Sequence, residues 1–257
     1  MPRIKLIMEY DGSNYHGYQR QPNANTIQAE LEQVIFNISR ETVTVTAAGR
    51  TDAGVHALGQ VAAFNTEVDI PADKWEAALN SLLPKDIRVL SSEAVSPDFH
   101  PQFGAVQKTY RYLIYRGKER LAFYRKYALL NDQRLDVKAM QGACSLIVGQ
   151  HDFRCFCASG SGARTWERTV RVCSLEDSGD WLKLTITADG FLYNMVRIIV
   201  GTLLEIGRGR FTADQMAVII ASRDRSLAGP TAPPQGLYLC TVEYRDADGL
   251  QVAQRQW

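Results

Sequence analysis

Residues 43–57 read VTVTAAGRTDAGVHA and place a carboxylate between two glycines behind a strand pattern. The alternation in VTVTAAG predicts a strand. Directly after it, Gly49 and Gly54 bracket Asp52, which predicts a loop that a ligand can approach closely. A carboxylate at such a strand end can act as a nucleophile or general base if a cation keeps it ionised. A tight turn in which Asp52 bonds its own backbone also explains this local pattern.

The segments on both sides of this loop show a mixture of strand and helix patterns. Strand patterns cover residues 3–10, 61–67, 88–94, 109–116, 168–175, 181–188 and 236–244. Helix patterns cover residues 27–38 after a capping Thr26, then 71–83, 137–149, 193–205 and 212–220 behind Thr212. The mixture predicts an α+β fold with a largely antiparallel sheet. We expect two pseudo-symmetric halves, residues 1–104 and 105–257, flanking a basic cleft.

The composition is that of a globular protein. The chain has 257 residues, of which 46% are hydrophobic and 22% are charged, which argues against disorder. Neither a signal peptide nor an apolar run of about 20 residues is present, so we expect a cytoplasmic protein. Cys155 and Cys157 are spaced too tightly for a usual zinc site, so we expect free or buried thiols.

The distribution of charge is more informative than the net charge of +1. The stretch from Lys108 to Lys126 is basic, rich in Tyr and Phe, and contains Glu119 as its single acid. Such a mixture is expected where phosphates and exposed bases are both contacted. Further arginines follow at positions 164, 168 and 171. A merely solvated basic surface remains the alternative interpretation.

Arg197 lies within the otherwise apolar helix pattern FLYNMVRIIVGTLLEIG. A buried arginine needs a partner, and a carboxylate partner would itself be kept ionised by the pairing. Alternatively, the guanidinium lies at the edge of the apolar face with its head in water. No zincin, Walker or dinucleotide-binding motif is present, and His151-Asp152 has no further histidine at ligand spacing. We therefore expect side-chain chemistry without a metal or an organic cofactor.

A long, ordered set of motifs resembles the tRNA pseudouridine synthase A family, a branch of the pseudouridine synthase superfamily. The blocks are YDGSNYHGYQRQ, GRTDAGVHALGQVAAF, ALNSLLP, FHPQFGAVQKTYRYLIY, GQHDFRCFCASG, GFLYNMVRIIVGTLLEIGRGR and AGPTAPPQGLYL. They span nearly the whole chain in the family's order, and GRTDAGVHA is highly specific.

The resemblance implies a role for five residues. Asp52 matches the catalytic aspartate, and Arg197 in NMVR matches the arginine that pairs with it. Tyr110 in KTYRY matches the tyrosine that stacks on the target base. Arg50 matches the arginine that helps the uridine leave the RNA stack, and Val196 matches the aliphatic position beside the paired arginine.

The resemblance also implies the reaction: isomerisation of uridine to pseudouridine in the tRNA anticodon arm, at positions 38, 39 and 40, by a homodimer. The target nucleotide must leave the stack to be reached. Whether Asp52 attacks C6 of uracil, attacks C1′ of ribose or assists a glycal route stays open. Two other classes are a non-catalytic RNA-binding protein and a carboxylate-dependent nucleoside hydrolase. The first leaves Asp52 beside RNA unexplained, and the second lacks a second acid or metal.

Overall fold

A computed structural model describes residues 1–246 and 249–252 of the chain. These residues form two compact units: unit 1 contains residues 1–106 and the described residues from 238 on, and unit 2 contains residues 107–237. Helices and strands are mixed in both units, and most strand pairs are antiparallel. The expected α+β class is therefore confirmed. None of the described helices is both long and apolar enough to cross a membrane.

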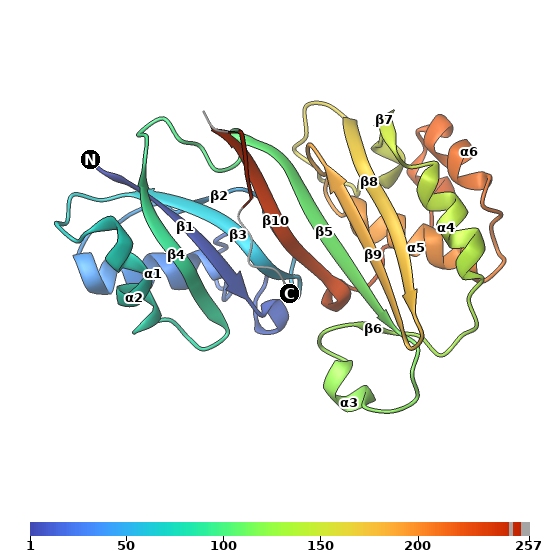
Figure 1. Cartoon of the computed structure of the whole chain (residues 1–257), viewed down its shortest axis with the longest axis horizontal. Coiled ribbons are helices and arrows are strands. Elements are labelled where there is room, and N and C mark those ends of the chain that lie inside the picture. Colours follow the sequence, from blue (N-terminus) through green and yellow to red (C-terminus); the bar gives the residue numbers. More distant parts are fainter. Residues whose placement is uncertain (247–248, 253–257) are drawn as a thin grey trace. The chain divides into compact units, whose positions relative to one another are not determined.

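Unit 1 is built around a sheet in which β1 lies between β3 and β4, antiparallel to both (Figure 1). Strand β10 joins β3 in parallel at His56 and Ala57. The elements of unit 1 are β1 (Arg3–Tyr10), η1 (Gly12–Asn14), α1 (Ile27–Ser39), β2 (Thr46–Ala47), β3 (His56–Asn65), η2 (Ala72–Lys74), α2 (Trp75–Asn80), β4 (Ile87–Val95), β10 (Leu237–Asp246) and β11 (Gly249–Val252).

Local sequence explains the two best-predicted elements of unit 1. Strand β1 has the expected bounds, and Leu6 and Met8 are fully buried, as a period of two requires. Helix α1 begins after Thr26, whose Oγ1 accepts a hydrogen bond from the Ala29 N–H at 3.3 Å. Leu31 on this helix is fully buried in the core.

The strand expected over residues 43–49 is much shorter in the structure, because only Thr46 and Ala47 pair with β3. The Val45 N–H instead donates to Glu32 Oε1 of α1 at 3.0 Å, so a side chain replaces a neighbouring strand. Strand β3 is longer than the expected 61–67, because it begins at His56 directly behind the Asp52 loop. The loop is therefore anchored at the start of a central strand.

Unit 2 is built on a second run of paired strands in the order β5, β9, β8 and β7. The β8–β9 hairpin has the expected antiparallel pairing. The elements of unit 2 are β5 (Ala105–Tyr115), α3 (Leu121–Tyr124), β6 (Leu129–Leu130), α4 (Val137–Ser145), β7 (Gly149–Asp152), η3 (Arg154–Phe156), β8 (Glu167–Ser178), β9 (Trp181–Ala188), α5 (Met195–Gly207), α6 (Gln215–Ser222), η4 (Arg225–Leu227) and η5 (Pro234–Gly236).

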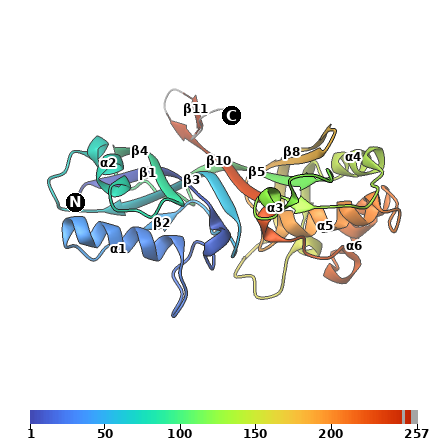
Figure 2. The ribbon, with the colours of Figure 1, turned by 90° about the horizontal axis from the view of Figure 1, so that it is seen from below.

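Helix α5 is the central helix of unit 2 and runs along one face of its strands (Figure 2). Every residue of α5 except Arg197 is buried. Helix α4 packs against α5 and β8. This apolar environment explains why the α5 sequence is hydrophobic on nearly all sides.

Several expected boundaries in the second half of the chain differ from the structure. Helix α4 ends at Ser145 rather than residue 149, and Gly149, with a φ of +120°, begins β7. Helix α6 begins at Gln215, since Thr212 lies in a turn whose N–H donates to the Gln215 side chain. Strand β10 from Tyr238 on lies in unit 1, although the expected division grouped all residues after 105 together.

Candidate active site

The Asp52 loop connects β2 to β3 in unit 1, and its backbone is held at several points. The Gln60 side chain donates to the Gly49 carbonyl at 2.7 Å, and Tyr10 Oη shares a hydrogen bond of 2.8 Å with Thr51 Oγ1. The Val55 N–H closes a turn onto the Asp52 carbonyl at 3.1 Å. Asp52 itself is partly exposed. The loop therefore presents a carboxylate from a backbone that cannot easily shift.

A second segment, residues 11–18, packs backbone to backbone against this loop. The Tyr18 N–H donates to the Thr51 carbonyl at 3.0 Å, and the Gly54 N–H donates to the Tyr15 carbonyl at 3.3 Å. A Cβ on Gly12 would lie 2.0 Å from the Val55 carbonyl oxygen. Only glycine permits this approach, which explains the glycines in the YDGSNYHG motif.

His56 links the two segments from inside the core, where its side chain is 2% exposed. Its Nδ1 accepts the Gly12 N–H at 3.1 Å, and Asp11 Oδ1 lies 3.2 Å from the same nitrogen. The His56 ring therefore joins residues 11–12 to the strand that follows the Asp52 loop. The ring also stacks on Tyr238, with centroids 4.8 Å apart.

Tyr10 lies beneath the loop as a neutral phenol. Burial raises the pKa of Tyr10 to about 12, against smaller lowering effects of its hydrogen bonds with Thr51 and Gln60. Tyr10 therefore serves as a hydrogen-bonding support for the loop and does not titrate at neutral pH. Arg50, in the same loop, is exposed to solvent.

In unit 2, Arg197 is held at both ends of its guanidinium. Its Nη1 donates to Asn194 Oδ1 at 2.7 Å, and its Nε donates to the Ala232 carbonyl at 2.8 Å. Asn194 takes a left-handed conformation with φ of +61°, which an asparagine tolerates better than most residues. Neighbouring Val196 is 3% exposed. The Arg197 side chain is thus oriented by groups of its own unit.

The loop that supplies the Ala232 carbonyl is itself bound to α5. The Gly229 N–H donates to Thr202 Oγ1 at 2.8 Å, and the Ala232 N–H donates to the Arg197 carbonyl at 3.0 Å. A Cβ on Gly201 would lie 1.7 Å from the Pro230 carbonyl oxygen, so the loop lies directly on the helix at this glycine. The AGPTA sequence and the glycine of α5 form one support for Arg197.

Tyr110 lies on β5 and is 8% exposed. Its ring meets Phe191 edge to face, with centroids 4.9 Å apart and an angle of 80° between the planes. This packing holds an aromatic ring in a defined orientation. Two residues earlier on the strand, burial and, to a lesser extent, the positive charge of Arg168 lower the pKa of Lys108 to about 8.

The sequence-predicted site residues therefore divide between the units. Asp52 and Arg50 share one loop of unit 1, while Tyr110, Val196 and Arg197 belong to unit 2. Sequence reasoning missed the supporting residues Tyr10, Gly12, His56, Asn194 and Gly201. Their signal was present, since each lies within a motif block that also carries the family resemblance.

The structure offers no metal-binding cluster in residues 1–246 and 249–252: no three His, Cys, Asp or Glu side chains are grouped there as metal ligands. The described cysteines are buried.

Comparison with known proteins identifies the family. The model of the tRNA pseudouridine synthase family matches residues 6–104 and 143–245. The tRNA pseudouridine synthase A of Syntrophomonas wolfei is 58% identical over 244 residues, covering 95% of this chain and 98% of that protein. The proteins of the same name from Moorella thermoacetica and Acetivibrio thermocellus are 49% and 50% identical, each over 95% of this chain and 100% of theirs. The chain therefore belongs to the tRNA pseudouridine synthase family, whose members are isomerases.

Proposed function

We propose that this tRNA pseudouridine synthase isomerises uridines 38, 39 and 40 of the anticodon arm, with Asp52 as the essential carboxylate. The observation that carries the proposal is the Asp52 loop, in which the Tyr10, Tyr15, Tyr18 and Gln60 contacts hold a partly exposed carboxylate. The positions of the target uridines follow from the family resemblance.

The reaction breaks the N1–C1′ bond of uridine, turns the base and joins C5 to C1′, with loss of the C5 proton and protonation of N1. Asp52 acts as the nucleophile or assists a glycal route during bond cleavage. Because no net oxidation or hydrolysis occurs, side chains alone can carry out this chemistry.

Arg197 is proposed to pair with Asp52 and keep it ionised. Its support comes from Asn194 and the Ala232 carbonyl, which orient the guanidinium before substrate binds. A preoriented cation stabilises negative charge without reorganisation during the reaction. Val196, the preceding residue on α5, is 3% exposed and is proposed to fill the aliphatic position beside the paired arginine.

Tyr110 and Arg50 are proposed to hold the extruded nucleotide. The Tyr110 ring is fixed by Phe191 and offers an aromatic surface to the loosened uracil. Arg50 is exposed on the Asp52 loop and occupies the space that the uridine leaves in the RNA stack. In this proposal the unit with the Asp52 loop and the unit with Tyr110 and Arg197 are the two functional halves.

The first experiment compares the wild type with Asp52→Asn on tRNA carrying tritium at uridine C5, in the presence of EDTA. Formation of the C5–C1′ bond releases the tritium. We expect release by the wild type and a loss of at least about 10³-fold in Asp52→Asn, as for removal of a catalytic group. Asp69→Asn, at an exposed carboxylate of the same unit, is the matched control and should retain activity.

The alternatives give different results. A wild type that binds tRNA but releases no tritium is an RNA-binding protein, and release of free uracil identifies a hydrolase. Equal release by the wild type and Asp52→Asn removes Asp52 from its proposed role.

Position and assembly are tested separately. Carbodiimide modification followed by primer extension should mark pseudouridine at positions 38, 39 and 40, and marks elsewhere would reject the proposed arm. We also propose that the enzyme is a cytoplasmic homodimer. Light scattering should give twice the 28.7 kDa chain mass, whereas the chain mass itself at micromolar concentration would exclude a stable dimer.

A further inference from the structure

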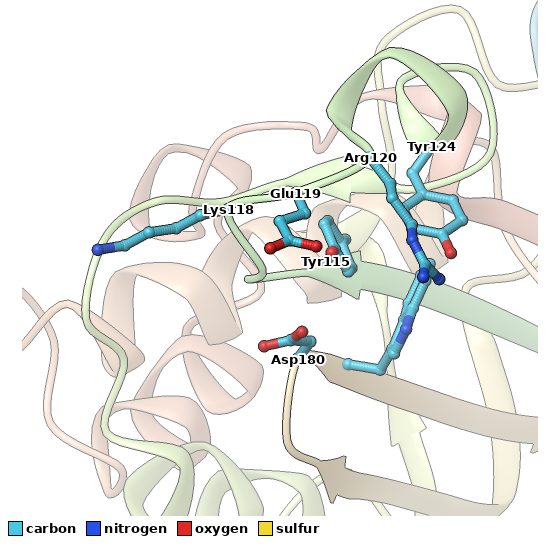
Figure 3. A pocket seen from close by; sticks show the side chains of 7 residues that line it. Tyr115, Lys118, Glu119, Arg120, Tyr124 and Asp180 are labelled. Atoms are coloured by element: carbon cyan, nitrogen blue, oxygen red, sulfur yellow. The ribbon is translucent and has the colours of Figure 1, made fainter.

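A hollow of about 380 Å³ lies in unit 2 where β5 ends and β9 begins, beside the short helix α3 (Figure 3). Its volume is within the range of about 300–1,000 Å³ that is typical of sites for small ligands. The lining residues from β5 to α3 lie between the two stretches that the family model matches. Asp180 and Trp181, which complete the lining, lie inside the second matched stretch, so the hollow combines residues that the family model matches with residues that it does not.

Aromatic rings form one wall of this hollow. The ring centroids of Tyr115 lie 4.7 Å from those of both Tyr124 and Trp181, and the centroids of Tyr124 and Trp181 lie 4.8 Å apart. Tyr115 is 4% exposed, whereas Tyr124 and Trp181 are only half-buried. The half-buried rings present apolar surface to whatever enters the hollow.

Charged side chains of both signs line the hollow beside these rings. Lys118 and Arg120 are positive, and Glu119 and Asp180 are negative. Figure 3 shows the Glu119, Tyr115 and Asp180 side chains around the same space. Burial raises the pKa of Tyr115, and the negative charges of Asp180 and Glu119 raise it further, so both carboxylates act on its hydroxyl. The hollow therefore offers hydrogen-bond acceptors as well as cations.

The backbone around the hollow is held in place without a ligand. A Cβ on Gly117 would lie 2.2 Å from the Tyr115 hydroxyl and 2.9 Å from Asp180 Oδ2, so glycine is required there. The Arg116 N–H donates to the Asp180 carbonyl at 2.7 Å, which fastens the end of β5 to the β8–β9 turn. Arg120 takes a φ of +58° before α3. A preformed site loses less entropy when it binds its ligand.

We infer that this hollow binds one unpaired nucleotide of the tRNA substrate, separately from the uridine that is modified. The inference rests on tRNA being the substrate. Unpaired RNA bases are recognised by stacking on aromatic rings and by hydrogen bonds to their edges. Tyr124 and Trp181 supply the stacking surface, and Lys118 and Arg120 supply the phosphate contact.

The two carboxylates select the base. Glu119 and Asp180 accept hydrogen bonds, so they favour a base edge that donates them. Guanine offers adjacent N1–H and N2–H donors that a single carboxylate can accept, whereas uracil offers only N3–H. A site for phosphate alone would not need carboxylates. We therefore expect a preference for guanine over uracil.

Steady-state kinetics of tritium release from intact tRNA test this inference. Glu119→Gln keeps the size of the side chain and removes its charge, and Arg120→Gly fits the left-handed backbone while removing the guanidinium. We expect Glu119→Gln to raise KM by about tenfold, which is within the range measured for a lost base contact. Arg120→Gly loses a phosphate contact and should also raise KM, and kcat should be unchanged in both variants. The controls Asp132→Asn and Lys138→Gln, at exposed sites that do not line the hollow, should leave KM unchanged.

Trp181 fluorescence provides a direct measurement of binding. In a background of Trp166→Phe and Trp257→Phe, the remaining tryptophans are Trp181 and the fully buried Trp75. Intact tRNA should quench the emission, GMP should quench it more strongly than UMP, and Glu119→Gln should abolish the difference between them.

Each other outcome overturns the inference or part of it. If the Glu119 and Arg120 variants keep the wild-type KM and tRNA leaves Trp181 unquenched, the rings only pack α3 against the sheet. If GMP binds but KM for tRNA is unaffected, the hollow takes a free nucleotide and the tRNA assignment is wrong. If the wild type releases no tritium, the proposed activity itself is wrong. The fluorescence measurement does not depend on that activity, so the two failures can be told apart.

Discussion

Lys108 is a largely buried cation on the strand that carries Tyr110. It lies two positions before Tyr110 on β5, so both side chains project from the same face of the strand. Burial and Arg168 lower the pKa of Lys108 to about 8. At neutral pH the ammonium is therefore charged but easily neutralised, beside the ring proposed to hold the target base.

The first prediction concerns the pH dependence of tRNA binding. As pH rises from 7 to 9, Lys108 loses its charge, so the affinity for tRNA should fall. Lys108→Arg should bind with little change over this range, because arginine stays charged. Fluorescence anisotropy at constant ionic strength measures both, with Lys138→Arg as the control. Equal pH dependence in the wild type and Lys108→Arg would remove Lys108 from the interface.

A rise in pH has opposite effects on tRNA binding and on stability through Lys108: it weakens binding but increases the free energy of unfolding. Between the folded pKa of about 8 and the unfolded value of 10.5, the unfolded chain binds more protons at Lys108. Charged Lys108 therefore destabilises the fold in full below the folded pKa. This cost shrinks as pH rises through the window, so the free energy of unfolding increases. Urea denaturation of the wild type and Lys108→Met at pH 7 and 9.5 should show the variant's stability advantage shrinking at the higher pH.

The second prediction concerns His56, which joins residues 11–12 to the Asp52 loop. His56→Ala removes the acceptor of the buried Gly12 N–H, which costs about 1–3 kcal/mol, and also the stacking on Tyr238. We expect a lower free energy of unfolding together with a lower kcat, because the Asp52 loop loses one of its supports. His16→Ala, at an exposed side chain of the same segment, should change neither. Full kcat in a folded His56→Ala would show that the loop does not need this contact.

Helix α5 is almost entirely buried, yet it carries two charged residues, Arg197 and Glu205. Arg197 near its start is oriented by Asn194 and Ala232, and Glu205 near its end accepts hydrogen bonds from Arg208 at 2.7 Å and Arg210 at 2.8 Å. Burial alone raises the pKa of Glu205, but these arginines outweigh it and hold the pKa below its usual value. The stabilising contribution of Glu205 is consequently lost as pH falls through that lowered pKa.

The third prediction compares two helical glycines. In Gly201→Ala the new Cβ would lie 1.7 Å from the Pro230 carbonyl oxygen, so the loop bearing Ala232 must move away. We expect a loss of about 1–3 kcal/mol in stability from overpacking and a fall in kcat as Arg197 loses its orientation. Gly142→Ala on α4 is the control, because its Cβ meets only Ala213 at 3.9 Å.

The two glycine variants should therefore differ in their stability, measured by calorimetry, and in their kcat. Gly142→Ala should be stabilised by about 0.5–1 kcal/mol, as expected for alanine replacing glycine within a helix, with unchanged kcat. Equal effects of the two substitutions would contradict the close contact between α5 and the 229–232 loop.

At the scale of the whole molecule, the net charge of +1 conceals a local concentration of basic residues from 108 to 126 in unit 2. Local charge, rather than net charge, determines how many phosphates are neutralised and how many counterions are released. A nearly neutral protein can therefore bind RNA in a strongly salt-dependent way.

The fourth prediction tests this distribution. Raising monovalent salt from about 50 to 200 mM should weaken tRNA binding by roughly 10²-fold, as for a few phosphate contacts. The melting temperature of the protein without RNA should change little over the same range. A flat salt dependence of the tRNA Kd would mean that the basic stretch does not contact the RNA backbone.

The sequence by itself determined the elements whose local pattern is complete. Strand β1 and the β8–β9 hairpin follow from a period of two, and α1 follows from Thr26 and helical spacing. The motif blocks also established the family, because specific residues at specific spacings are a property of the sequence. The roles of Asp52, Arg50, Tyr110, Val196 and Arg197 remain proposals that the experiments above address.

Only the tertiary structure decided what holds the site. The Val45 N–H bonds to Glu32 of α1 instead of a strand, and His56 receives its hydrogen bond from Gly12, 44 residues earlier. Strand β10 returns to pair with β3 at His56 after the whole of unit 2. These contacts join residues far apart in the chain, and local periodicity carries no information about them. Which backbone supports the Asp52 loop is therefore a property of the folded chain alone.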